Sequence, residues 1–180
     1  MESKYWQRTH KYGIKIPKSV KEAYEFDENN KIKLWIDGIK EEMNKVRVAV
    51  QESNVSPDKW IGHQEIGIHM IFDIKLAENF RRKAIMVSGG YTTKTPSSVT
   101  YSYVISRDSV LIMLMIAALN DLYLQAADIE NTYLTAPFRE KIWTRAGPEF
   151  GMDEEKVFIV VRALYGLKFS GAAFRAFLAE

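Results

Sequence analysis

Two kinds of hydrophobic spacing occur along the chain, and together they predict a mixture of helices and strands. From residue 34 to residue 46, apolar side chains recur every three or four positions with charged residues between them, which is the pattern of an amphipathic helix. Ser19 lies three positions before Glu22, the spacing of a capping box, and this predicts the start of another short helix. A last helix is expected over residues 170–179.

The longest apolar run covers residues 110–119 and predicts a buried helix. Ser106 or Asp108 can cap it, and its apolar residues lie nearly all round, which is typical of a helix enclosed by other elements. A helix that crosses a membrane needs about 20 apolar residues. The run is therefore interpreted as part of a protein core, and no membrane partner is expected.

Strands are expected where β-branched residues alternate or cluster between turn signals. Residues 65–75 and 84–88, joined by a polar and basic turn, predict a β-hairpin. The stretch up to Pro17 shows no clear period and is expected to be irregular. Further strands are predicted over residues 122–129, 139–145 and 157–161. Strands and helices in this order predict an α+β fold with a mixed or antiparallel sheet and packed helices.

Composition narrows the class of protein only moderately. The chain has 180 residues, of which 47% are hydrophobic and 27% charged, as in a globular protein. It has no cysteine, which excludes disulfides and thiolate metal sites and agrees with an intracellular protein, cytoplasmic or nuclear. The net charge of +2 is too small to indicate nucleic-acid binding by itself.

Asp128 is the first candidate for chemistry. It ends the predicted strand over residues 122–129, where a carboxylate at a sheet edge can hold a divalent cation. Phosphoryl transfer uses such carboxylates, but one aspartate cannot hold two ions. Taken alone, Asp128 has a structural alternative, as a helix N-cap or an ordinary strand-end residue. An aspartate in such a position more often has a structural role than a metal-binding one.

Several segments, in order along the chain, resemble the reverse transcriptases of copia-type retrotransposons. Residues 126–137 resemble the first palm motif of that family and read AADIENTYLTAP. Residues 160–178 resemble the second and read VVRALYGLKFSGAAFRAFL. Upstream, the stretch RRKAIMVSGGYTT at residues 81–93 resembles the family's fingers hairpin. The resemblance covers nearly the whole chain.

The resemblance implies the fingers and an incomplete palm of a right-hand polymerase. Residues 1–60 would be an N-terminal extension with a fingers helix, residues 61–105 the fingers hairpin region, and residues 106–180 part of the palm. Asp128 would be the catalytic metal ligand, and the main-chain carbonyl of Ile129 a weaker second ligand, for Mg²⁺ or Mn²⁺.

The same resemblance implies nucleotide-binding roles for seven further side chains or backbone positions. Tyr133 would be the steric gate that excludes a 2′-hydroxyl, although a core aromatic is the alternative. The basic residues of the hairpin would grip a triphosphate, although a solvated turn is the alternative; they are Lys75, Arg82 and Lys83. Three positions of the second motif would line the nucleotide and template pocket or simply form a strand-to-helix turn: Tyr165, Gly166 and Lys168.

The chain departs from the family pattern in two places that matter for activity. The third palm motif, Tyr-x-Asp-Asp, does not occur in the sequence, and no thumb segment is recognised. Ile85 stands where the fingers motif normally has an arginine, and an isoleucine cannot grip phosphate. We therefore expect the chain to be inactive alone, although the resemblance implies descent from an RNA-directed DNA polymerase.

The expected partners of the intact enzyme are an RNA or DNA template with its primer, deoxynucleoside triphosphates and the remainder of a Pol polyprotein. Two alternatives remain open at this point. The chain could be a remnant that binds nucleic acid without catalysis, or a degenerate fragment without function.

Overall fold

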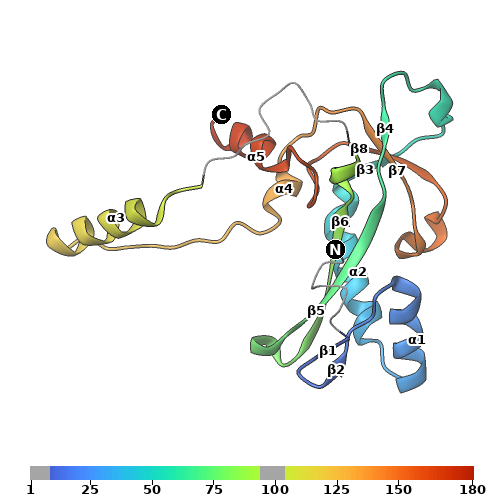
Figure 1. The fold of residues 1–180 in the computed structure, drawn as a ribbon, viewed down its shortest axis with the longest axis horizontal. Coiled ribbons are helices and arrows are strands. Elements are labelled where there is room, and N and C mark those ends of the chain that lie inside the picture. Colours follow the sequence, from blue (N-terminus) through green and yellow to red (C-terminus); the bar gives the residue numbers. More distant parts are fainter. Residues whose placement is uncertain (1–8, 94–103) are drawn as a thin grey trace.

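The computed structural model describes residues 9–93 and 104–180, and its body is built on a β-hairpin with a helix lying against it (Figure 1). Strand β5 (Ile68–Lys75) pairs antiparallel with β6 (Arg81–Ser88), from Ile68 opposite Ser88 to Lys75 opposite Arg81. The predicted hairpin is confirmed, but its second strand begins three residues earlier than expected. The basic residues Arg81 and Arg82 therefore belong to the paired strand and not to the turn.

Helices α1 (Val20–Asn30) and α2 (Leu34–Val46) form as the hydrophobic pattern predicts. The Ser19 hydroxyl accepts a hydrogen bond from the Glu22 backbone N–H at 3.2 Å, so the predicted N-cap is present. Helix α2 has no capping side chain of its own at its start. Instead, the buried Asp27 carboxylate of α1 accepts hydrogen bonds from the backbone N–H groups of Trp35 and Ile36, both at 2.9 Å.

A small four-stranded sheet lies next to the hairpin, in the order β3-β8-β7-β4. These strands are β3 (Val50–Glu52), β4 (Gln64–Glu65), β7 (Ile142–Arg145) and β8 (Val157–Val160). β4 runs parallel to β7, and the other neighbours are antiparallel, so the sheet is mixed as expected. A two-residue pair, β1 (His10–Lys11) with β2 (Ile14–Lys15), forms in the stretch that we expected to be irregular.

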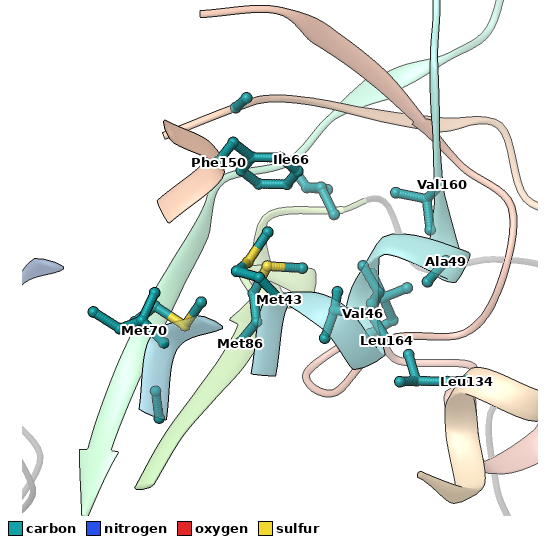
Figure 2. Packing of buried hydrophobic residues seen from close by; sticks show 14 of the residues in the cluster. Met43, Val46, Ala49, Ile66, Met70, Met86, Leu134, Phe150, Val160 and Leu164 are labelled. Atoms are coloured by element: carbon teal, nitrogen blue, oxygen red, sulfur yellow. The ribbon is translucent and has the colours of Figure 1, made fainter. Parts of the chain in front are cut away.

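The core lies between α2, the hairpin and the four-stranded sheet. Figure 2 shows Met43 and Val46 of α2, Met70 and Met86 of the hairpin, and Val160 of β8 converging there. A fully buried Leu, Ile, Met or Val side chain of this kind contributes roughly 1.5–3 kcal/mol to folding. Helices α4 (Thr132–Thr135) and α5 (Ser170–Leu178) are short, and α5 ends one residue before its predicted end.

Helix α3 (Arg107–Leu119) forms where predicted, with the Ser106 hydroxyl accepting from the Ser109 backbone N–H, but it is not buried. Leu111 is 50% exposed and Leu119 is 75% exposed, and only Ala117 of this helix is buried. The helix projects from the body (Figure 1). The expectation of burial was wrong because no element among the described residues packs around the apolar surface.

Within residues 9–93 and 104–180, no helix is long and apolar enough to cross a membrane.

The predicted strand over residues 122–129 is also wrong. This stretch has no strand assignment and returns along α3 toward the body without a ladder partner (Figure 1). Its β-like sequence is not sufficient, because a strand exists only when its backbone groups pair with a neighbour. Asp128 therefore ends an extended, exposed segment and does not end a strand of a sheet. We call α3 together with residues 120–127 the apolar arm.

Candidate functional site

The hairpin, helix α2 and the turn that follows the apolar arm border a polar cleft of about 390 Å³. Six of the nine site residues expected from the sequence line it, and they come from three separate stretches of chain: Lys75, Arg82, Lys83, Asp128, Ile129 and Tyr165. Lys75 and Asp128 are 53 positions apart in the sequence, and folding brings both into the lining of the same cleft. We call this feature the charged cleft.

The basic wall of the charged cleft comes from the hairpin. Lys83 is half-buried and lies opposite Asp73 in the strand register, while Lys75 at the end of β5 is exposed. Arg82 is held back from the open space, because its guanidinium lies over the Trp35 ring at 5.6 Å and donates to the Phe80 carbonyl. Lys83 and Lys75 are therefore the better placed of the three cations to meet an anion.

The opposite wall is the turn that follows the apolar arm. Asp128 is exposed, and Asn131 adopts a left-handed conformation with φ of 52° that starts helix α4. The Thr132 hydroxyl donates to the Ile129 carbonyl oxygen at 2.6 Å. One lone pair of that carbonyl is thus in use, and the other is left for a further ligand.

Tyr133 does not line the charged cleft but supports a residue that does. Its ring packs edge-on against Tyr165, with centroids 5.1 Å apart, and against Phe174 at 6.5 Å. Burial raises the pKa of the Tyr165 hydroxyl, and the nearby Glu42, Tyr133 and Asp128 raise it further. The phenol at the cleft is therefore protonated at neutral pH and can donate a hydrogen bond.

Gly166 and Lys168 lie beside the cleft and not in its lining. Gly166 has φ of 93° and lies so close to Ser88 that an added Cβ would meet the Ser88 carbonyl oxygen. The Lys168 ammonium donates to the Thr93 carbonyl. Gly166 thus packs against the end of β6 and Lys168 bonds to the segment that follows it, which fits the turn interpretation given above.

Sequence reasoning found Asp128 but missed the four glutamates that line the charged cleft. Glu41 and Glu42 of α2 line it, as do Glu78 and Glu130. Glu41 joins the network by accepting from Arg81 and from Lys45, both at 2.8 Å. The i, i+4 spacing of Glu41 and Lys45 indicated a surface ion pair. Nothing in the sequence indicated that this helix faces the hairpin.

The donor set of the charged cleft is small for a metal centre. Across residues 9–93 and 104–180, no group of three or more acidic or histidine side chains could hold an ion. Mg²⁺ is usually bound by one or two carboxylates together with water and substrate phosphates. Asp128 and the free lone pair of the Ile129 carbonyl fit the protein's share of such a site, for an ion that arrives with a phosphate ligand.

Comparison with known proteins places these features in a family. Residues 55–180 match the family described as reverse transcriptase (RNA-dependent DNA polymerase). The truncated transposon Ty1-A Gag-Pol polyprotein of Saccharomyces cerevisiae is 27% identical, over 88% of this chain and 14% of its own length. The transposon Ty1-DR5 Gag-Pol polyprotein of the same yeast is likewise 27% identical, over 88% of this chain and 10% of its length. No solved structure matches.

The chain thus spans between a tenth and a seventh of the polyproteins it resembles. The matched region contains the hairpin, the turn carrying Asp128 and the segment from Tyr165 to α5. With the family matched over more than half of the chain, the conclusion is direct: this protein belongs to the reverse transcriptases of copia-type retrotransposons.

Proposed function

We propose that the charged cleft is the nucleotide site of an RNA-directed DNA polymerase. The observation that carries the proposal is the gathering of Lys83, Asp128 and Tyr165 around one space, from segments that match the family in sequence. In this proposal, residues 1–60 form an N-terminal extension with a fingers helix, residues 61–105 the fingers hairpin region and residues 106–180 part of the palm. The chain works inside the cell, in the cytoplasm or nucleus.

The basic wall binds the triphosphate of an incoming deoxynucleotide. Lys83 and Lys75 neutralise phosphate charge, as ammonium groups do in other phosphate sites. Asp128 and the Ile129 carbonyl would hold the Mg²⁺ or Mn²⁺ that accompanies the nucleotide, and such an ion would supply positive charge against the phosphates. Arg82 adds positive charge near the phosphates without contacting them, because its guanidinium is engaged by Trp35 and Phe80.

The two tyrosines act together on the sugar side. Tyr165 lines the charged cleft and donates from its hydroxyl, while Tyr133 lies behind its ring. Tyr133 serves as the steric gate if the pair turns toward the nucleotide when it binds. Gly166 and Lys168 keep the second motif against the hairpin, beside the path of the template.

The complete reaction requires more carboxylates than the described residues provide. A two-ion centre needs several acidic ligands, and this chain contributes Asp128 to it. We therefore propose that the intact enzyme combines this chain with further polyprotein segments that contain a Tyr-x-Asp-Asp motif. Primer and template, RNA or DNA, are the other partners.

Primer extension tests the proposal. The substrate is an RNA homopolymer template with a DNA primer and Mg²⁺, and the enzymes are this chain and a version continued through a Tyr-x-Asp-Asp segment of the same element. Extension by the longer form only, abolished by Asp128→Asn and retained in Asp121→Asn, is expected. Equal extension by the Asp128→Asn form would overturn the assignment of this carboxylate.

A second candidate is a module that binds nucleic acid without catalysis, which the basic side chains Lys75 and Lys83 on the hairpin favour. Binding to a primer–template would then depend on salt and weaken in Lys83→Ala. Nucleic-acid binding by the 180-residue chain, together with no extension by the longer form, would favour this candidate over the first.

A further inference from the structure

The strand that carries Lys83 has one edge paired with β5 and the other edge facing the rest of the protein. Three contacts hold that second edge. The Arg82 carbonyl lies against Gly38 of α2, close enough that a Cβ at Gly38 would be 2.9 Å from its oxygen. The Ser88 backbone N–H donates to the Tyr165 carbonyl at 2.8 Å. Between them, the Glu42 Oε1 atom accepts from the Met86 backbone N–H at 2.9 Å.

The middle contact differs in kind from the other two. In a sheet, the backbone N–H of an edge strand normally donates to a backbone carbonyl of a neighbouring strand. At Met86 the acceptor is instead the Glu42 side chain, which takes the place of that carbonyl. Glu42 is 9% exposed, and it also lines the charged cleft. One side chain therefore fixes the hairpin to helix α2 and borders the space in which the nucleotide is proposed to bind.

The charged groups around Glu42 come from every element that packs against it. Lys83 faces it from β6, Tyr165 from the loop before α5, and Lys45 and Glu41 from its own helix. Burial raises the pKa of the Glu42 carboxyl, and the Met86 N–H, Lys45 and Lys83 only partly oppose that effect. The geometric role of this carboxyl is that of a hydrogen-bond acceptor for the Met86 backbone N–H.

We infer that Glu42 is a positioning residue of the charged cleft: by accepting from Met86 it holds β6 in register against α2 and so keeps Lys83 directed at the phosphates of a nucleoside triphosphate. The inference rests on the proposed function. Glu42 itself touches neither nucleotide nor metal in this assignment. Glu42 acts on Lys83 through the β6 backbone, in which Met86 and Lys83 are three positions apart.

Two substitutions separate the hydrogen bond from the charge. Glu42→Gln keeps an oxygen at the Met86 N–H and removes the charge, while Glu42→Asp keeps the charge and is one methylene too short. Asp27→Ala is the matched control, because Asp27 is another buried carboxylate that accepts backbone N–H groups of α2, at the helix end away from the cleft. It removes a buried carboxylate whose hydrogen bonds go to the backbone of α2 and not to the backbone of β6.

The experiment is titration calorimetry of the 180-residue chain with dTTP and Mg²⁺ at neutral pH, with the Met86 amide followed by NMR. We expect Glu42→Asp to weaken binding roughly tenfold, because a hydrogen bond to a charged group is lost. Glu42→Gln should stay within about twofold of the wild type or bind more tightly, because Lys83 loses a competing anion. Asp27→Ala should bind as the wild type does.

Three results would overturn the inference. Unchanged binding in Glu42→Asp, with the Met86 amide shifted, would mean that the contact is only structural. Equal loss in Glu42→Gln and Glu42→Asp would mean that the charge matters, as for a metal ligand. No dTTP binding by the wild type would remove the proposed nucleotide site and the inference with it, whereas failure of the inference alone leaves wild-type binding intact.

Discussion

Ser88 and Tyr165 are 77 positions apart in the sequence, yet both the backbone N–H and the hydroxyl of Ser88 donate to the Tyr165 carbonyl, at 2.8 and 2.7 Å. This double contact joins the end of the hairpin to the segment that resembles the second palm motif. It requires close approach of two backbones, which explains the glycine at position 166. The contact therefore fixes one side of the charged cleft relative to the other.

Gly166→Ala is expected to disrupt this junction. The new Cβ would collide with the Ser88 carbonyl oxygen and would also occupy a left-handed conformation, with φ of 93°. The expected loss in the free energy of unfolding is about 3 kcal/mol, from backbone strain and overpacking together. Urea unfolding measures it.

Gly13→Ala is the control for the strain alone. Gly13 has φ of 75°, but an added Cβ would meet no atom within 4 Å. A loss of about 1 kcal/mol is expected there. Equal losses at the two glycines would show that the backbones near Ser88 can separate at little cost.

The stability of the protein should depend on pH through Glu149. Burial raises the pKa of this carboxyl above its ordinary value, outweighing hydrogen bonds from the backbone N–H groups of Glu149 and Gly147. A raised folded-state pKa means that the contribution to stability is complete below the unfolded pKa and is lost as pH rises through the folded one. Glu149→Gln should therefore gain stability relative to the wild type between about pH 4 and pH 7.

Asp153 should show the opposite trend, which makes it an internal comparison. Hydrogen bonds from Lys156 and Arg47 lower the pKa of its carboxyl, so its contribution is present above the unfolded pKa and lost on acidification. Urea unfolding of wild type, Glu149→Gln and Asp153→Asn from about pH 2 to pH 7 gives both slopes, because the Asp153 contribution changes only below the ordinary aspartate pKa of about 4. Parallel pH profiles for the two variants would contradict the assigned causes.

The apolar arm should contribute almost nothing to the stability of the body. Ile112 of α3 is 54% exposed, whereas Ile39 of α2 is 2% exposed in the core. Ile112→Ala is expected to change the free energy of unfolding by less than about 0.5 kcal/mol, and Ile39→Ala to lower it by about 3 kcal/mol. A large loss in Ile112→Ala would mean that the arm packs against the body in solution.

The exposed arm also has a consequence for solution behaviour. Contiguous apolar surface on a monomer favours association, so we expect the 180-residue chain to self-associate through the apolar arm while its body stays folded. Sedimentation velocity on the wild type and on Ile112→Glu tests this, with less self-association expected in the variant. A monodisperse wild-type monomer would contradict the expectation.

Local signals in the sequence were sufficient for several elements. Ser19 and Ser106 cap helices at the predicted positions, and the hairpin pairs as its alternating residues require. The apolar run 110–119 is helical as expected, but its surroundings depend on packing partners, which a local pattern does not specify. The prediction of a strand over residues 122–129 was wrong for the same reason, because a strand forms only when a neighbouring strand pairs with it.

The candidate site was predicted unevenly for a similar physical reason. Family resemblance supplied Lys83, Asp128 and Tyr165, which the fold brings to one cleft. Glu42 carries no sequence signal of its own, because its role arises only when α2 crosses the unpaired edge of β6. Arg82 carried the right chemistry, but its stacking on Trp35 could not be foreseen from either residue alone.

The central claim is that the charged cleft binds the nucleotide, and NMR mapping of dTTP with Mg²⁺ on the isotopically labelled chain tests it most directly. The expected result is a set of saturable amide shifts centred on Lys83, Asp128 and Tyr165. The opposing result is a set of shifts in the groove on the other side of Arg82, between Lys15 and Asn30, with the charged cleft unchanged.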